Sequence, residues 1–278
     1  MTPTVRTMTR ADLDLALDWA AAEGWNPGLA DAAAFHAADP DGFLVAEVDG
    51  APAASLSIVR FGRGAGFLGL YICAPAFRGQ GVGYALWQAG MERLAPETLG
   101  LDGVPEQQAN YARSGFELSH RSHRFSGRLA ADRPDHTEPL AHGDLAAVLA
   151  LDLGVTGFDR AGFMADWLLG DPSRQARVLR HDGEIAALGV IRACLSGHKI
   201  GPLFAADRDA AERMLDGLGR IAAGAPVSID VPEPNAPAMS MVVARGLTSD
   251  FETARMWRGP APAQDIARTF GVATFELG

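Results

Sequence analysis

Residues 70–87 read LYICAPAFRGQGVGYALW and contain the feature that decides the fold. An apolar stretch ends at Pro75, three glycines follow at Gly79, Gly81 and Gly83, and a helical pattern begins directly after them. Glycine inside a regular element costs about 0.5–1 kcal/mol relative to alanine, so three here indicate a close approach to the backbone. Free N–H groups at the start of a helix attract anions, and we therefore predict a phosphate-binding turn.

Two common phosphate-binding patterns do not fit this stretch. A Walker A loop needs a lysine after its last glycine, whereas the only lysine of the chain is Lys199. A G-x-G-x-x-G dinucleotide fingerprint would place its third glycine at Tyr84, and it would follow the first strand of a domain rather than the third. A plain loop before a helix is the remaining structural alternative.

The chain contains two copies of one pattern. The pair Asp49-Gly50 recurs 133 positions later at Asp182-Gly183, and Gly69 recurs 132 positions later at Gly201. Further matches at similar spacing are Arg60 with Arg192, Gly115 with Gly246 and Arg124 with Arg255. Repeated landmarks in one order indicate a duplicated globular domain. We predict domains at residues 1–130 and 131–278, joined within the polar stretch GRLAADRPDHTEP.

The first copy has the pattern of a mixed α/β (α+β) domain. Periodicity predicts helices over residues 11–23 and 30–38, then three strands between residues 43 and 75 with a turn at Asp49-Gly50. A helix from the glycine turn to residue 94 follows. The strand TLGLDG, the helix EQQANYARSG and the strand FELSHRSHRFSG complete the copy. The expected product is a mixed sheet flanked by helices, formed twice.

The turn resembles motif A of the GCN5-related N-acetyltransferases (GNATs), whose pattern Arg/Gln-x-x-Gly-x-Gly/Ala is matched by Arg78, Gly81 and Gly83. The stretch YARSGF, residues 111–116, resembles the late Tyr-x-x-x-Gly-Phe motif of that family. The chain as a whole is similar to two-domain members, through DVPEPN, FETARMWRGP and the terminal FGVATFELG. The resemblance implies a tandem GNAT fold, with a catalytic first domain and a divergent second domain.

The resemblance also implies acetyl-CoA as the cosubstrate, no metal, and a set of residues that bind the cosubstrate. Those residues are Tyr71, Ile72, Arg78, Gly79, Gln80, Gly81, Val82 and Gly83. An amine would attack the thioester directly, and the N–H group of Ile72 would bind the oxyanion. Tyr111 would protonate the leaving thiolate, because a phenol pKa near 10 is close to a thiol pKa of about 8.5.

Other roles stay open at this point. Candidates for the base that takes the proton of the amine are Glu106, Asp102, Tyr71, Glu23 and a water relay. Trp25 in WNPG lies where the family has its substrate loop, and it either lines the acceptor site or anchors a helix end. The terminal FELG could also reach the first copy through Glu276.

The second copy lacks the cosubstrate features. At the offset of 132, Arg78, Gly81 and Gly83 correspond to Ala210, Arg213 and Leu215, which lie in an uninterrupted acidic helix. Tyr111 corresponds to a valine, Val242. Many GNATs carry an asparagine seven residues before the tyrosine. The first copy has Val104 at that position, whereas the second copy has Asn235. We expect one active site per chain.

Composition limits the partners. The formal net charge is −10, which disfavours nucleic acid and suits a neutral or cationic small molecule. The two cysteines form no CxxC pair, and the start of the chain lacks the apolar core of a signal peptide. We expect a cytoplasmic enzyme for a small amine, with no membrane contact and a homodimer left open. A catalytically weak acyl-CoA sensor or regulatory module is the alternative function.

Overall fold

Two sets of elements with the same order make up the computed structural model, which describes residues 3–62 and 64–278. The first copy comprises β1 (Thr4–Thr7), α1 (Arg10–Ala22), α2 (Asp31–Ala38), β2 (Phe43–Val48), β3 (Ala51–Phe61), β4 (Ala65–Cys73), α3 (Val82–Leu94), β5 (Thr98–Gly103), α4 (Gln108–Arg113) and β6 (Glu117–Arg128). The second copy comprises β7 (Glu138–Pro139), α5 (Leu145–Thr156), α6 (Ala161–Leu169), β8 (Arg174–His181), β9 (Glu184–Ala193), β10 (His198–Ala205), α7 (Arg208–Ala222), β11 (Pro226–Pro232), α8 (Ala236–Ala244) and β12 (Thr248–Arg258). A last short strand, β13 (Thr269–Gly271), lies beyond the repeat.

The predicted element order is confirmed except for β1, which the periodicity did not indicate. This strand has four residues and pairs antiparallel with β2 at the edge of the sheet. An edge strand this short has too few positions for an alternating pattern. Arg6 on β1 lies between Asp12 and Glu47, so charge as well as the ladder holds the strand in place.

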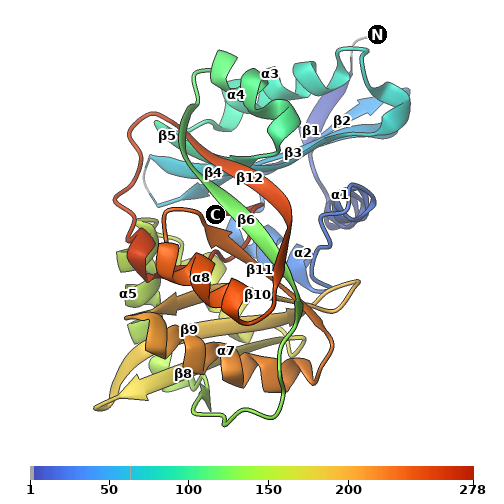
Figure 1. Ribbon diagram of the computed structural model, residues 1–278. Helices are drawn as coiled ribbons and strands as arrows, with labels where there is room; N and C mark the ends of the chain where they lie inside the picture. The colour runs from blue at the N-terminus through green and yellow to red at the C-terminus, as the bar shows by residue number, and fades with distance from the viewer. Residues whose placement is uncertain (1–2, 63) are drawn as a thin grey trace.

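The strands form one sheet in which the last strand of each copy pairs with the other copy. Its order among the described residues is β1-β2-β3-β4-β5-β12-β6-β11-β10-β9-β8-β7, with β13 paired to β10. Thus β12 of the second copy pairs with β5 of the first, and β6 of the first pairs with β11 of the second. Figure 1 shows β6 and β12 side by side between the copies. The exchange joins the copies by backbone hydrogen bonds as well as by side chains.

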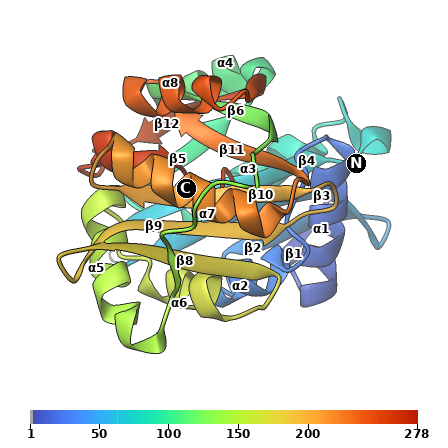
Figure 2. The same ribbon diagram turned by 60° about the horizontal axis from the view of Figure 1, so that its bottom comes forward.

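Helix α3, which follows β4, and helix α7, which follows β10, occupy equivalent places in the two copies. α3 packs on β2, β3 and β4, and α7 packs across β8, β9 and β10 (Figure 2). The hairpin turns Asp49-Gly50 and Asp182-Gly183 are also equivalent, since all four residues have positive φ angles of 50–84°. Two consecutive residues with positive φ form the turn that suits the twist of a two-residue hairpin. The turn predicted at Asp49-Gly50 is confirmed.

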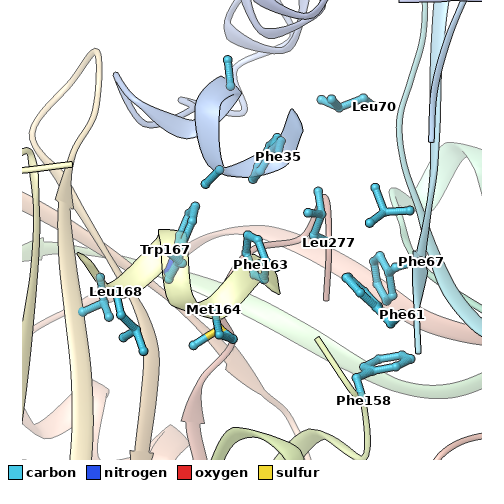
Figure 3. Packing of buried hydrophobic residues seen from close by; sticks show 14 of the residues in the cluster. Phe35, Phe61, Phe67, Leu70, Phe158, Phe163, Met164, Trp167, Leu168 and Leu277 are labelled. Atoms are coloured by element: carbon cyan, nitrogen blue, oxygen red, sulfur yellow. The ribbon is translucent and has the colours of Figure 1, made fainter. Parts of the chain in front are cut away.

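A hydrophobic core lies between the copies and includes the end of the chain. The ring of Phe35 on α2 stacks on Trp167 of α6 with centroids 6.2 Å apart, and Phe158 packs against Phe61 and Phe67. Leu277 is fully buried among these side chains (Figure 3). The C-terminal segment is therefore part of the core that holds the two copies together.

Candidate active site

A groove opens in the first copy where β4 and β5 stop pairing. The parallel ladder runs from Ala65↔Thr98 to Leu68↔Leu101 and ends there. The next residues of β4 form a bulge: the register against β3 shifts between Gly69 and Ile72, and Leu70 has a φ of +46°. A bulge bends its strand and increases its twist. The bend turns the end of β4 away from β5.

The resulting groove has a volume of about 590 Å³ and is lined by the predicted turn. Among the lining residues are Glu23, Trp25, Tyr71, Ile72, Cys73, Arg78, Gly79, Gly81, Gly83, Tyr84, Val104, Glu106 and Gln107. Six of the eight residues predicted to bind the cosubstrate therefore line one groove. The other two do not: Val82 is fully buried in the core, and the Gln80 side chain donates to the Ala76 carbonyl oxygen at 2.7 Å.

The three glycines have two different functions. Gly79 and Gly81 have φ angles of +74° and +81°, and a Cβ atom on either would meet nothing within 4 Å. They are glycines because of their backbone conformation, and they leave open space over the turn. Gly83 has ordinary φ, but its Cβ would lie 3.2 Å from the Tyr71 hydroxyl. It allows α3 to approach β4 closely.

The start of α3 is open to an anion. Gly81 is its N-cap and offers no side chain to the first amides of the helix. Among the described residues, the N–H groups of Gly79, Gln80, Gly81 and Val82 have no backbone acceptor. Such amides attract negative charge at a helix N-terminus. Arg78 steadies the turn, because it donates to the Cys73 carbonyl oxygen at 2.8 Å and forms an ion pair with Glu23.

The backbone of β4 also presents a hydrogen-bond donor to the groove. The Ala74 N–H group donates to the Ala53 carbonyl oxygen of β3, and Ile72 stands opposite Ser55. N–H groups alternate in direction along a strand, so Ile72 faces β3 like Ala74, and the Cys73 N–H group faces the groove. The geometry favours Cys73, not Ile72, as the amide that meets a ligand.

A second, smaller cavity of about 60 Å³ adjoins the groove and lies between the copies. Trp25, Tyr71, Val104 and Gln107 line both spaces. The cavity is otherwise lined by Leu68, Leu70, Leu101, Asp102, Tyr111, Arg124, Phe251, Thr253, Phe275 and Glu276. Trp25 therefore lines both spaces, and its N–H group also donates to the Ala20 carbonyl oxygen at the end of α1 at 3.0 Å.

Hydrogen bonds from the β9–β10 hairpin and from Arg124 on β6 fix the segment around Trp25. Lys199 and Arg124 donate to its carbonyl oxygen at 2.7 and 3.2 Å. Asn26 and Ser196 exchange two hydrogen bonds of 2.8 and 3.0 Å. The loop that separates groove from cavity is thus held by the β9–β10 hairpin.

Tyr111 lines the cavity with most of its ring in the core. The ring stacks on Trp87 with centroids 5.6 Å apart, and a Cβ on Gly103 would lie 2.8 Å from it. Burial raises the pKa of Tyr111, and burial also raises the pKa of Tyr71 to about 12. Both phenols therefore stay protonated and can donate a hydrogen bond. Tyr111 is a weaker acid than the ordinary phenol pKa suggested from the sequence.

The candidate bases differ in how free they are. Asp102 has no exposed side-chain surface and accepts two hydrogen bonds from Arg255, at 2.7 and 2.8 Å. Glu23 is paired with Arg78. Glu106 lines the groove but not the cavity. The carboxylates suggested by the sequence near the motifs are therefore engaged or displaced from the cavity.

The equivalent groove of the second copy is filled by the chain itself. The β10–β11 ladder ends at Ile200↔Ile229, which matches the end of the β4–β5 ladder. β13 then pairs with β10 at Leu203 and Phe204, and the Val272 N–H group donates to the Asp230 carbonyl oxygen of β11 at 2.9 Å. The tail thus bridges the two strands where they separate.

The helix start in the second copy is closed as well. Asp207 is the N-cap of α7, and its carboxylate accepts from the Ala210 N–H group at 2.9 Å. Asn235 caps α8 and donates to the carbonyl oxygens of Ile266, Ala267 and Thr269. The asparagine of the second copy therefore holds the segment that leads into β13.

Two family models match the chain in the places that the duplication predicts. An acetyltransferase (GNAT) family model matches residues 11–116, and an acetyltransferase (GNAT) domain model matches residues 148–271. A holothin acyltransferase from Pseudoalteromonas sp. (strain SANK 73390) is 30% identical over 264 residues, which cover 94% of this chain and 90% of the relative. The chain belongs to the GNAT family. Its recognition from the glycine turn and the duplication is confirmed.

Solved structures place this GNAT among proteins of the same overall architecture. A putative acetyltransferase from Pyrococcus horikoshii has a TM-score of 0.84 at 19% identity, with 100% of this chain and 96% of that chain covered. A tandem GNAT protein from the clavulanic acid biosynthesis pathway has a TM-score of 0.65 at 16% identity, covering 93% and 99%. At this identity the likeness shows the fold alone. No helix in the described parts of this GNAT is long and apolar enough to cross a membrane.

Most residues that line the cavity of this GNAT could not be predicted from the sequence. Arg124, Phe251 and Phe275 come together only because the last strands are exchanged and the tail returns to the first copy. One signal was present: Gly69 and Gly201 are equivalent, and both are glycine for the same reason. A Cβ on Gly69 would lie 2.2 Å from the Glu276 carbonyl oxygen, and one on Gly201 would lie 2.3 Å from that of Val272.

Proposed function

We propose that this GNAT transfers the acetyl group of acetyl-CoA to the primary amine of a small molecule, and that residues 1–130 carry the chemistry. Residues 131–278 form the divergent domain of the proposal, without a glycine turn. The observation that supports it is the open groove with Gly79, Gly81 and the free helix start at one end and the cavity with Tyr111 at the other.

The proposed reaction follows from the positions of these groups. The amides of the turn bind the pyrophosphate, which leaves the thioester near the end of β4. The Cys73 N–H group donates to the oxyanion as the amine attacks. A donor of this kind is worth about 2.7–4 kcal/mol in other acyl-transfer enzymes. Tyr111 donates a hydrogen bond to the departing sulfur and passes on its proton as the thiolate leaves.

The acceptor is proposed to enter through the cavity rather than through the groove. The relative named for holothin supports acyl transfer as the activity, and holothin therefore belongs among the acceptors to be tested. The small volume and largely apolar lining favour a compact acceptor over a protein chain.

Isothermal titration with acetyl-CoA tests the cosubstrate and the number of sites. We expect a stoichiometry of one per chain. A value of two would contradict the closure of the second groove, and no binding would contradict the proposed function. Binding without transfer to any amine would favour the alternative of an acyl-CoA sensor.

A further inference from the structure

The last ten residues of the chain serve both copies. β13 enters the groove of the second copy, and the chain then crosses to the first copy, where the Glu276 backbone lies against Gly69 at the bulge of β4. Leu277 is fully buried, and Arg160, itself paired with Asp152, donates to the carbonyl oxygen of Gly278. Both sides of Glu276 along the tail are therefore anchored.

Glu276 lines the cavity between the copies, and its side chain has a defined orientation. The residue is 6% exposed, and its Oε2 accepts a hydrogen bond from the Thr274 hydroxyl. The Thr274 oxygen also accepts from the Glu276 N–H group at 3.2 Å. Among the described residues, no hydrogen bond is made to Glu276 Oε1 and no cation lies within 4 Å of the carboxylate. One carboxylate oxygen is left for a ligand.

The other two charged groups of the cavity are already paired. Asp102 is held by Arg255 in two hydrogen bonds. Arg124 donates twice to Asp230, at 2.7 and 2.9 Å, and its guanidinium lies 5.2 Å from the ring centre of Phe251 and 5.3 Å from that of Phe275. An incoming carboxylate would find no free cation here, whereas an incoming ammonium would find Glu276.

We propose that Glu276 binds the ammonium group of the acceptor and takes its proton, and that the acceptor is a compact primary amine with an apolar body and no carboxylate. The inference rests on the proposed function, which it extends by naming the base and the class of acceptor. The apolar walls from Leu70, Val104, Phe251 and Phe275 would enclose the body of the amine.

The proposed reaction conserves protons and electrons. Glu276 takes one proton from R–NH₃⁺, and the nitrogen lone pair forms the C–N bond to the thioester carbon. The C–S bond breaks, the sulfur leaves with the electron pair, and Tyr111 gives it a proton. The second proton lost by the nitrogen restores the phenol. One proton per turnover passes from Glu276 to solvent.

The surroundings of Glu276 raise the pKa of its carboxyl group above the ordinary value. Burial raises the pKa of Glu276, and Asp31 on α2 raises it further. Lys199 on β10, Arg192 on β9 and Arg124 on β6 oppose the rise. Burial also lowers the pKa of Lys199 to about 8. Efficient general bases have a pKa near the working pH, so the upward direction favours this role.

The test compares Glu276→Gln with Glu252→Gln in the full chain. Glu252 is a half-buried carboxylate on β12, next to two cavity residues; it pairs with Arg121 and does not line the cavity. The probes are benzylamine, which is cationic at neutral pH, aniline, which is neutral, and phenylglycine, which is benzylamine with an added carboxylate. Release of CoA from acetyl-CoA is followed with a thiol reagent over a range of pH.

We expect acetylation of benzylamine to fall at least about 100-fold in Glu276→Gln at neutral pH and to change less than about 2-fold in Glu252→Gln. The loss of rate in Glu276→Gln should be smaller for aniline, which has no ammonium proton to lose. For benzylamine, the loss should become smaller as the pH rises and the amine deprotonates. Phenylglycine should not be acetylated. Glu276→Asp, which keeps the carboxylate, should restore part of the rate.

Two results would overturn the inference while the proposed function stands. One is an equal loss for benzylamine and aniline, or no loss, in Glu276→Gln with normal acetyl-CoA binding. The other is transfer by the wild type to phenylglycine and not to benzylamine, or transfer to another amine but to none of the probes. If the wild type does not bind acetyl-CoA, the proposed function itself is overturned. Titration of each variant with acetyl-CoA shows that it is folded.

Discussion

The helix starts of α3 and α7 occupy equivalent places in the two copies and have opposite properties. Gly81, the N-cap of α3, has no side chain and lines an open groove. Asp207, the N-cap of α7, has a carboxylate that accepts a hydrogen bond from the helix. The strand pairs beside them differ in the same sense: β4 and β5 enclose open space, whereas β13 fills the gap beside β10.

The difference shows how one copy of a duplicated fold can hold open space where the other copy is filled by its own residues. In the second copy, the Asp207 carboxylate lies at the start of α7, and the C-terminal segment occupies the gap between the strands. The same segment continues to the first copy and contributes Phe275 and Glu276 to the cavity there. Under the proposed function, the segment that closes one copy therefore supplies part of the active site of the other.

The largest effect is expected from giving α3 the cap that α7 has. Gly81→Asp should weaken acetyl-CoA binding by at least about 100-fold, or about 2.7 kcal/mol, because a carboxylate would compete with the pyrophosphate for the first amides of the helix. Isothermal titration measures the loss directly.

Gly81→Asn is the matched control for this change. Asparagine has nearly the same shape as aspartate and also tolerates positive φ, but it carries no charge. It should bind acetyl-CoA at least about 10-fold more tightly than Gly81→Asp does. Equal affinities for the two variants would mean that the side chain, not its charge, excludes the ligand. Unchanged affinity in Gly81→Asp would contradict the assignment of the turn.

A smaller effect is expected at the position where the copies differ in their phenol. Tyr111→Phe turns the position toward the apolar Val242 of the second copy while keeping the ring that packs on Trp87. Turnover should fall about 10- to 100-fold, because the sulfur loses its hydrogen-bond donor, and acetyl-CoA affinity should hold within about 3-fold.

Steady-state kinetics with benzylamine and titration with acetyl-CoA separate the two effects of Tyr111→Phe. Tyr84→Phe removes a phenol that lines the groove but not the cavity and is 64% exposed, so it shows what the loss of a hydroxyl costs outside the cavity. Turnover of Tyr111→Phe equal to that of the wild type would remove Tyr111 from the mechanism and leave it as a core residue.

Local patterns in the sequence predicted those parts of the fold that depend on local chemistry. The glycine turn, the hairpin at Asp49-Gly50 and the helix after residue 81 each follow from residues within a few positions of one another. The duplication followed from counting offsets. The prediction for α7, an uninterrupted helix without a glycine turn, also followed from its own residues.

The parts that were missed depend on contacts between distant segments. The exchange of β6 and β12 does not change the pattern of either strand, because each still alternates against an antiparallel neighbour. For the tail, the sequence suggested only that Glu276 could reach the first copy, as it does. The segment from Val272 to Glu276 is short, and its partners lie more than 40 residues away in β10, β11 and β4. The equivalent glycines Gly69 and Gly201 indicated a close approach of another segment to each strand, but a glycine alone does not identify that segment.

The smallest effect is expected from removing the cap of α7, and it distinguishes the two ways in which the second site is closed. Asp207→Ala should lower the free energy of unfolding by about 1 kcal/mol, within the range of 0.5–2 for the loss of an N-cap side chain. Thr9→Ala, which removes the N-cap of α1, should cost a similar amount and is the control in the first copy. Urea denaturation measures both.

The stoichiometry of acetyl-CoA should stay at one per chain in Asp207→Ala, because β13 and the Val272–Asp230 hydrogen bond still fill the groove. A second molecule bound by this variant would show that the carboxylate alone had closed the site, and the tail would then be a support for the first copy and not a substitute for the ligand of the second.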